Sequence, residues 1–209
     1  GALPSQKLRQ LVEAGFIKNI EEKNIRPSSI DLSVSDEIYK VEGIFQPRPK
    51  ESVRDVLECI KKTKHSLGKP LVKNQMYIAR LNETMKLPKG VYGVCNPKST
   101  SGRMDTHVRL IADGVSRYDM LMPAGWKGEL WISIVPKSFS IKLYKGVTLN
   151  QIRLFNEDTR FDVLDLEVEF QKSKLLWQQY KGKAYKYDDI KVRDDDGSLI
   201  LTLDLENEI

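Results

Sequence analysis

The feature that most constrains the fold of this chain is a series of short segments in which apolar and polar residues alternate. The first covers residues 30–35, Ile-Asp-Leu-Ser-Val-Ser, and its period of two is typical of a half-buried strand. Further candidate strands cover 76–81, 90–95, 108–112, 129–135, 139–143 and 150–155. Turn signals such as Pro-Lys-Gly at 88–90 and Pro-Ala-Gly at 123–125 separate them. We therefore predict a mainly β domain, a barrel or distorted sandwich, with peripheral helices.

Two segments depart from the strand pattern and show helical spacing. Near the N-terminus, Ser5 is the expected N-cap of an amphipathic helix that ends near Gly15. The segment 51–64 carries apolar residues at helical intervals and predicts a second short helix. We expect both helices to lie at the edge of the β domain.

Composition places the chain among globular proteins. Of its 209 residues, 40% are hydrophobic and 30% are charged, and no apolar run approaches the length of a membrane span. The net charge of +5 is spread along the chain, whereas a duplex-DNA binder usually carries a basic stripe. We expect neither a membrane segment nor a nucleic-acid partner. Because no signal peptide is evident and Cys59 and Cys95 form no CxxC pair, we expect a cytoplasmic protein without a disulfide framework.

The last part of the chain is more polar. Residues 171–191 are rich in Lys, Gln and Tyr, and three aspartates follow at 194–196. After them, leucines alternate with other residues from Leu199, which predicts a new strand. We therefore predict one domain over 1–193, followed at 194–209 by an acidic connector and a strand that lead toward a further segment.

The stretch 96–103, Asn-Pro-Lys-Ser-Thr-Ser-Gly-Arg, is the most informative for function. It places three hydroxyls, two cations and a glycine in a turn directly after an apolar strand. Hydroxyl donors, backbone N–H groups and the forked guanidinium of Arg103 suit a phosphate or a carbonyl edge. The alternative is a solvated polar turn in which Arg103 forms a salt bridge, and composition alone favours that alternative.

The sequence lacks the residues that several common kinds of catalytic or nucleotide-binding site require. Zinc-dependent deamination needs a trio of His or Cys ligands with a glutamate, and the chain has two histidines, His65 and His107, and no PCxxC motif. Neither GxxxxGK[ST] nor GxGxxG occurs, which excludes the two commonest nucleotide-binding motifs. A Ser-His-Asp site would have to use His107, which we interpret as an edge histidine at a strand start. Trp126, between two glycines, is expected at the rim of a pocket, and Trp131 in the core.

Four motifs resemble, in order and approximate spacing, those of the dCTP deaminase and dUTPase superfamily. They are Pro-Ser-Ser-Ile-Asp-Leu at 27–32, Pro-Lys-Ser-Thr-Ser-Gly-Arg at 97–103, Gly-Trp-Lys-Gly at 125–128 and Gly-Val-Thr-Leu-Asn-Gln at 146–151. Leu-Pro-Ser-Gln at 3–6 and Asp-Gly-Ser-Leu at 196–199 look like the N-terminal half of tandem bacterial dCTP deaminases. The resemblance implies a dUTPase-like β-clip fold, assembled as a trimer or pseudo-trimer with active sites between units.

The resemblance also implies a reaction and its residues. In this family dCTP and water give dUTP and ammonia without zinc, and Mg²⁺ arrives with the triphosphate. A glutamate activates water, a serine and an arginine bind and polarise the substrate, and an alanine carbonyl helps to hold the water. The implied catalytic positions are Ser99, Arg103, Ala112 and Ser133, and the implied substrate-binding residues are Lys98, Thr100, Ser101, Trp126 and Gln151.

One of these positions departs from the family pattern. Counted from Gly-Trp-Lys-Gly, the expected glutamate is Ser133, whose hydroxyl cannot act as a general base near neutral pH. Glu129 lies four residues away, roughly 13 Å along a strand. On the strength of the four motifs, we expect the chain to be a dCTP deaminase domain. The alternatives are a catalytically degenerate nucleotide-binding or scaffold half of such an enzyme, and a dUTP diphosphatase, for which Pro123 stands near the position of the aspartate base.

Overall fold

The computed structural model describes residues 1–43, 46–158, 161–178, 182–192 and 199–200. The chain forms two compact units, Gly1–Asp158 and Thr159–Ile209. The domain boundary expected from the sequence, after residue 193, falls later than this division. The reason is that part of the polar stretch taken as the end of the first domain belongs to a unit with its own helix, α4 (Val163–Lys172).

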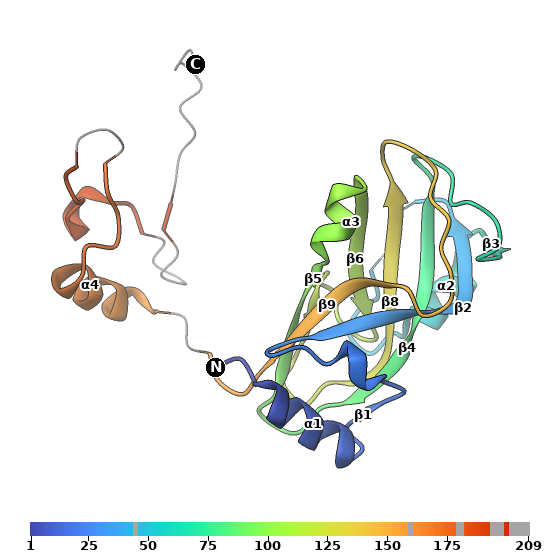
Figure 1. Cartoon of the computed structure of the whole chain (residues 1–209), viewed down its shortest axis with the longest axis horizontal. Coiled ribbons are helices and arrows are strands. Elements are labelled where there is room, and N and C mark those ends of the chain that lie inside the picture. The colour runs from blue at the N-terminus through green and yellow to red at the C-terminus, as the bar shows by residue number, and fades with distance from the viewer. Residues whose placement is uncertain (44–45, 159–160, 179–181, 193–198, 201–209) are drawn as a thin grey trace. The chain divides into compact units, whose positions relative to one another are not determined.

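The first unit is built on one antiparallel sheet (Figure 1). The described strands follow the order β6-β8-β4-β2-β9-β5-β7, with β1 added to β4 and β3 added to β2. Their bounds are β1 (Ile17–Lys18), β2 (Ile30–Val41), β3 (Lys62–His65), β4 (Met76–Lys86), β5 (Tyr92–Pro97), β6 (Thr106–Ala112), β7 (Met120–Leu121), β8 (Lys127–Pro136) and β9 (Thr148–Phe155). The predicted mainly β fold is confirmed.

The sheet curls into a nearly closed barrel because β2 changes partner along its length. Its first residues, from Ile30, pair with β9, and its later residues, from Val34, pair with β4. The two ends of the strand path meet at Asp119, just before β7. The Asp119 N–H donates to Leu110 of β6 at 3.0 Å, and its carbonyl accepts from Cys95 of β5 at 2.7 Å.

Two groups of buried side chains form the core. The larger one lies inside the barrel and includes the inward residues of the strands, among them Leu32, Leu110 and Ile132. The smaller one lies where α2 (Val53–Cys59) packs on Ile111 and Trp131. Each fully buried apolar side chain of this size contributes about 1.5–3 kcal/mol to folding. Trp131 is in the core, as predicted.

The helices agree with the sequence in place but differ in detail. The first, α1 (Ser5–Glu13), has Pro4 as its N-cap with no side-chain cap, so Ser5 is the first helical residue and not the cap. Gly15 follows with φ +77°, the left-handed conformation that a glycine C-cap supplies. In α2, the Ser52 hydroxyl and the Asp55 carboxylate form a capping box. The short α3 (Ser99–Arg103) replaces the predicted polar turn.

The strand predicted over 139–143 is wrong. The structure has a single bridge there, between Leu71 and Ile141. Ile141 and Leu143 are buried, whereas Ser140 and Lys142 face solvent, so the alternation is present from residue 140 on, although Phe139 is exposed and does not follow it. It reflects a loop lying on the barrel, which buries every second side chain without a paired strand.

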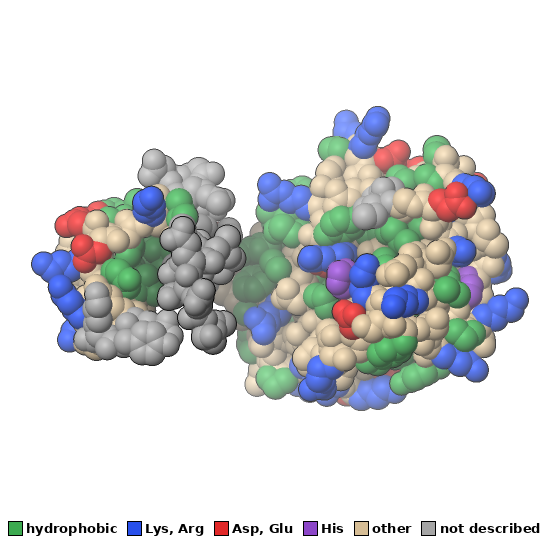
Figure 2. Space-filling model, turned by 90° about the horizontal axis from the view of Figure 1, so that it is seen from above, with side chains coloured by type: hydrophobic (Ala, Val, Ile, Leu, Met, Phe, Trp, Pro, Cys, Tyr) green, Lys and Arg blue, Asp and Glu red, His purple; other side chains and the backbone are tan. Residues whose placement is uncertain are grey.

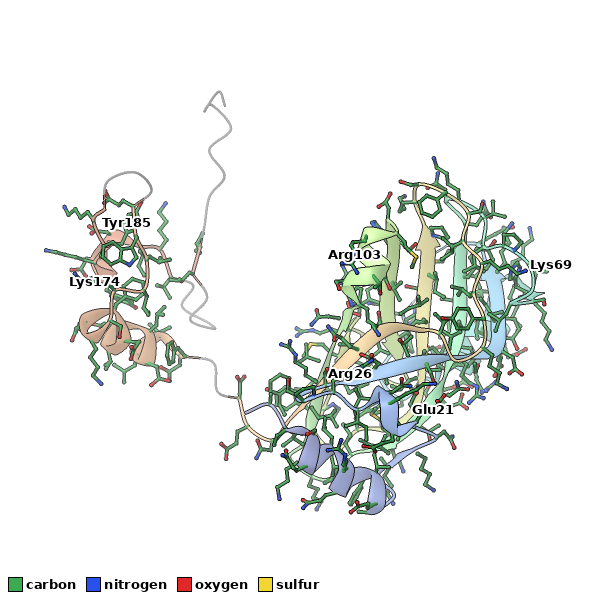
Figure 3. All side chains as sticks on the ribbon, in the orientation of Figure 1. Glu21, Arg26, Lys69, Arg103, Lys174 and Tyr185 are labelled. Carbon is green, nitrogen blue, oxygen red and sulfur yellow. The ribbon has the colours of Figure 1, made fainter. Side chains whose placement is uncertain are left out.

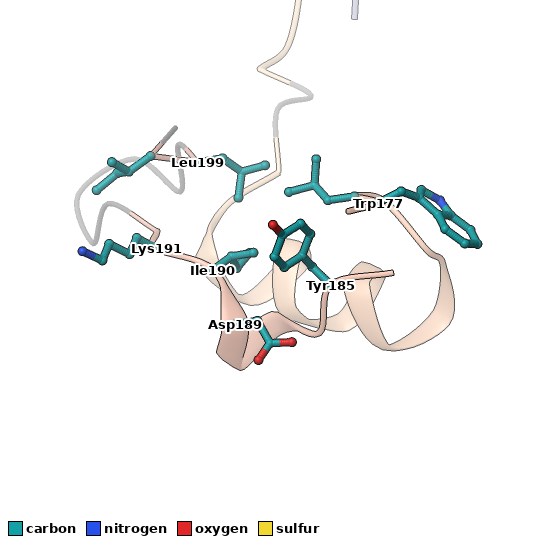
Figure 4. Close-up of a pocket in the computed structure, with 8 residues that line it drawn as sticks. Trp177, Tyr185, Asp189, Ile190, Lys191 and Leu199 are labelled. Atoms are coloured by element: carbon teal, nitrogen blue, oxygen red, sulfur yellow. The ribbon is translucent and has the colours of Figure 1, made fainter. Parts of the chain in front are cut away.

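The second unit is small. Asp162 and Asp165 form a capping box at the start of α4, and Phe170 contacts the ring of Tyr187 edge-on, next to a short 3₁₀ turn, η2 (Tyr187–Asp189). A cavity of about 420 Å³ lies in this unit. Trp177 and Tyr185 are among its lining residues, which Figure 4 draws as sticks. Most of the strand predicted from Leu199 lies outside the described residues. No helix of the described chain is long and apolar enough to cross a membrane.

Candidate functional site

The helix α3 is fastened to the barrel through its first turn. The Lys98 N–H donates to the Leu149 carbonyl at 2.8 Å, and the Ser101 hydroxyl donates to the same oxygen at 2.9 Å. Ser101 is completely buried. The third hydroxyl of the motif therefore anchors the helix on β9, and does not face solvent as a free donor.

Lys98 belongs to a charged cluster with two members from outside the motif. Its ammonium donates to the Asp31 carboxylate at 2.7 Å and to the Thr148 hydroxyl at 2.8 Å. Arg26 reaches the same carboxylate oxygen at 2.9–3.0 Å. Asp31 is almost fully buried, so two cations share one buried anion. The cluster holds the start of α3 against β2 and keeps a net positive charge at the surface.

The remaining polar groups of the motif point away from the barrel. Ser99, Thr100 and Arg103 are exposed, and within the described chain their side chains have no hydrogen-bond or ion-pair partner. Figure 3 shows Arg103 on α3. The salt bridge considered for Arg103 from the sequence is thus not formed inside this unit. A rigid support carries two hydroxyls and a guanidinium that are available to a ligand.

A cavity of about 650 Å³ lies beside α3, and its lining includes Lys98, Thr100, Met104 and residues 141–144 and 146–149. Besides Lys98, three residues of its wall are cationic, namely Lys23, Arg26 and Lys142. On the face of the first unit shown in Figure 2, Lys and Arg side chains are scattered over the surface. The positive lining suits an anionic group such as phosphate.

Ser133 lies in a different cavity. It is on β8 directly opposite Arg109 of β6, and it is 6% exposed. This second cavity, here called the Ser133 cavity, has a volume of about 420 Å³. Its lining residues are Met76, His107, Arg109, Tyr118, Asp119, Ser133 and Val135. Ser99 and Arg103 are not among them, so the described unit does not bring the two predicted parts of the site into one cavity.

Asp119 and Arg109 form an ion pair at the wall of the Ser133 cavity. Arg109 Nη1 lies 2.7 Å from Asp119 Oδ2, and the Leu110 N–H donates to Oδ1 at 2.8 Å. The Asp119 side chain is 12% exposed and that of Arg109 is 60% exposed. Because Asp119 pairs with Arg109 among the described residues, and not with His107, no Ser-His-Asp triad is assembled here.

Asp113 connects three parts of the chain beside Ala112. Its carboxylate accepts from the N–H groups of Val53 and Glu129, each at 2.9 Å, and its carbonyl accepts from the Trp126 indole at 2.8 Å. Trp126 is therefore buried and bonded, and not at a pocket rim as expected. Gly128 has φ +156°, and a Cβ there would lie 2.8 Å from the Trp126 ring, which explains the second glycine of the turn.

The comparisons with known proteins identify the family. A model described as the 2'-deoxycytidine 5'-triphosphate deaminase (DCD) N-terminal domain matches residues 1–158. The chain belongs to the dCTP deaminase N-terminal-domain family. A solved structure titled 2'-deoxycytidine 5'-triphosphate deaminase from Agrobacterium tumefaciens is similar, with 28% sequence identity and a TM-score of 0.73. The match covers 82% of this chain and 53% of that one, so this chain spans about half of its relative. A comparison with curated proteins found no match.

Membership of the dCTP deaminase family confirms the resemblance that the four motifs predicted. Of the implied site residues, Lys98, Ser99, Thr100, Ser101 and Arg103 lie together on or next to α3. Gln151 is half-buried on β9, next to Asp31 of β2 and Asn96 of β5 in register. Ala112 ends β6 fully buried, and its carbonyl accepts from the Val115 N–H at 3.2 Å. The part each plays toward a substrate stays a prediction.

Sequence reasoning assigned neither Asp31 nor Asp119 to these sites. Asp31 stands in the first of the family motifs, which was a usable signal, but its partner Lys98 is 67 residues away. Asp119 carries no local signal beyond its place in a loop, where it has φ +62°. No three His, Cys, Asp or Glu residues of the described ranges gather in a group that could hold a metal ion.

Proposed function

We propose that this chain is the nucleotide-binding half of a tandem dCTP deaminase, an enzyme of pyrimidine deoxynucleotide metabolism that converts dCTP and water to dUTP and ammonia. Its α3 presents Ser99 and Arg103 to a site shared with a neighbouring half or copy. The observation that carries this proposal is that the side chains of the motif fall into two sets. Those of Lys98 and Ser101 are hydrogen-bonded to the barrel. Those of Ser99, Thr100 and Arg103 are exposed and have no partner among the described residues.

The chemistry of these groups fits a nucleoside triphosphate. A guanidinium donates two parallel hydrogen bonds to a planar or anionic oxygen group, and hydroxyls add further donors. Lys98 and the cationic wall beside α3 lower the cost of bringing a polyanion near. Mg²⁺ enters as part of the substrate, bound to the triphosphate.

Ser133 determines which part of the reaction we assign to this half. Hydrolytic deamination without zinc needs a carboxylate to take a proton from the attacking water. The Ser133 hydroxyl does not do this near neutral pH, and the cavity around it is separate from α3. We therefore infer that the general base of the working site belongs to another half, in a trimer or pseudo-trimer, and that this half binds nucleotide.

The test is a comparison of binding with turnover. The chain of residues 1–209 is titrated with Mg·dCTP by calorimetry, and ammonia release is followed in the same samples and in the longer tandem protein. We expect binding with almost no ammonia from the chain, and both from the tandem protein. Rapid deamination by the purified chain would show that another residue serves as the base and would overturn the assignment of Ser133.

A further inference from the structure

Two connections of the first unit carry positive charge without any acidic residue. They are residues 66–75, between β3 and β4, and residues 137–147, between β8 and β9, here called the lysine loops. Together they contain five lysines and no Arg, Asp or Glu, namely Lys69, Lys73, Lys137, Lys142 and Lys145. Figure 3 shows Lys69 on the first of these loops. Lys145 reaches Asp36 at 3.5 Å, where both side chains are largely exposed. The other four lysine side chains have no ion-pair partner among the described residues, so most of this charge is uncompensated.

The lysine loops lie side by side on the barrel. Leu71 and Ile141 exchange two backbone hydrogen bonds, of 2.7 and 3.1 Å, and both side chains are buried. The Lys73 N–H donates to the Ser140 hydroxyl at 3.3 Å, so residues 72–73 run beside residues 139–140. The lysine loops therefore form one continuous surface that is anchored on the core.

Exposed apolar side chains gather on the same surface. The described part of the first unit has four large hydrophobic side chains that are exposed, and three of them belong to the lysine loops. They are Val72, 50% exposed, Phe139, 53% exposed, and Tyr144, 68% exposed, whereas the fourth is Met122. Apolar side chains gathered in this way, with charged residues around them, mark a surface that binds another protein or a membrane.

The residue types of this surface favour a lipid surface over a protein or a nucleic acid. Lys is depleted and Arg enriched at protein–protein interfaces, and Arg also makes the bidentate contacts to phosphate that nucleic-acid recognition uses. Lysines close to an anionic membrane are attracted by its surface potential without any fixed geometry. Phe and aliphatic side chains enter the boundary between headgroups and acyl chains, whereas Val72 has no aromatic face on which a base could stack.

We propose that the lysine loops bind the surface of an anionic membrane. Phe139 and Val72 enter the headgroup boundary, and the lysines lie next to the lipid phosphates. This contact needs no membrane-spanning segment, and it is reversible because few side chains insert and salt screens the lysines. It goes beyond the proposed function, since it uses neither Ser99 nor Arg103.

The experiment is co-sedimentation of the chain of residues 1–209 with lipid vesicles in the absence of nucleotide, so its result is independent of the proposed function. One set of vesicles is phosphatidylcholine alone, and the other is equal parts phosphatidylcholine and phosphatidylserine. Lys142 and Tyr144 also line the cavity beside α3 and are left unchanged. The test variants are Phe139→Ser and the double variant Lys69→Gln with Lys73→Gln. The matched controls are Met122→Ser and the double variant Lys86→Gln with Lys89→Gln, at exposed side chains outside the lysine loops.

We expect the unmodified chain to bind the phosphatidylserine vesicles, less tightly as salt is added, and not those of phosphatidylcholine alone. Each lysine near an anionic surface strengthens binding about fivefold, so the loop double variant should lower the affinity about tenfold or more. Phe139→Ser should lower it about fivefold or more, because an apolar insertion is lost. Both controls should bind like the unmodified chain, and the melting temperatures should not change, because all of these side chains are exposed. Absence of binding to phosphatidylserine vesicles, equal losses in the controls, or binding of a single-stranded oligodeoxynucleotide in place of the vesicles would overturn the proposal.

Discussion

Arg109 of β6 stands directly opposite Ser133 of β8, and both residues line the Ser133 cavity, where Ser133 occupies the expected position of a general base. Directly opposed residues of an antiparallel pair have Cβ atoms roughly 5 Å apart. A carboxylate at position 133 would therefore have a cation next to it, which offsets the cost of its burial.

Ser133→Glu should give the domain measurable deaminase activity if it assembles with a neighbour that supplies Ser99 and Arg103. General-base catalysis is typically worth about 10²- to 10⁴-fold, so we expect a rise within that range above the unmodified chain. Ammonia release from Mg·dCTP is the measurement. Ser133→Gln is the matched control, because it has the same size without a carboxylate. Equal activity in the two variants would mean that the gain does not come from proton transfer.

Arg103→Ala should weaken nucleotide binding by about 2–4 kcal/mol when the guanidinium pairs with the ligand in a desolvated interface. Because the side chain has no partner among the described residues, its removal should lower the affinity for the ligand and leave the stability of the fold unchanged. Calorimetric dissociation constants for Mg·dCTP provide the test. Arg153→Ala, at another exposed arginine on β9, controls for the loss of one positive charge. Similar losses of affinity in both variants would mean that Arg103 contributes only nonspecific electrostatic attraction.

Asp31→Asn should destabilise the first unit, because it removes the anion shared by Lys98 and Arg26. Hydrogen bonds to charged groups contribute about 1.5–3 kcal/mol, and Arg26 is half-exposed, so we expect a loss near the lower end. Urea unfolding at neutral pH measures it. Asp36→Asn breaks a largely exposed pair with Lys145 and should have little effect. Full stability in Asp31→Asn would show that Lys98 and Arg26 need no counter-ion to hold α3.

Much of the β framework follows from local pattern. Alternation at 30–35 and 150–155 predicts two strands that the structure pairs with each other in β2 and β9. The same signal fails at Ile141, where a loop buries alternate side chains without a paired strand. The conformation of the Ser-Thr-Ser-Gly-Arg segment was also missed, since α3 depends on Lys98 and Ser101 reaching Leu149.

The sites were harder to predict than the strands, because their contacts join residues far apart in the chain. The motif shows which residues are chemically able to bind phosphate, but not which of them the barrel uses. Lys98 is tied to Asp31 across 67 residues, and Trp126 donates to the Asp113 carbonyl instead of lining an opening. Asp119 is positioned by its backbone hydrogen bonds to Leu110 and Cys95, which close the barrel and which no short sequence pattern predicts.

Glu83 should make stability fall as pH rises. The carboxylate is fully buried and accepts hydrogen bonds from the Ser33 N–H and hydroxyl, and burial raises its pKa above the ordinary glutamate range. The folded state therefore binds this proton more tightly than the unfolded state. The stabilising contribution is complete below the ordinary pKa of about 4.3 and is lost as pH rises through the higher folded value.

Glu83→Gln should remove this dependence, since an amide does not titrate. The free energy of unfolding of both chains is measured by urea titration from pH 4 upward. The value for the variant minus the value for the unmodified chain should increase as the pH rises. Glu42→Gln, at an exposed glutamate paired with Lys61, provides a baseline for losing a surface charge. A difference that moves in the opposite direction with pH would mean that the folded state prefers the ionised Glu83.

The central claim is that α3 presents a nucleotide-binding surface, and ligand-dependent melting of the chain of residues 1–209 tests it most directly. A ligand that binds the folded state raises its stability by RT ln(1 + [L]/Kd), which is about 2.7 kcal/mol at a concentration of one hundred times Kd. We predict that Mg·dCTP raises the melting temperature of the unmodified chain in a concentration-dependent way, and that Ser99→Ala with Arg103→Ala removes most of the rise. No shift at millimolar dCTP or dUTP, or an equal shift in the double variant, would contradict the account.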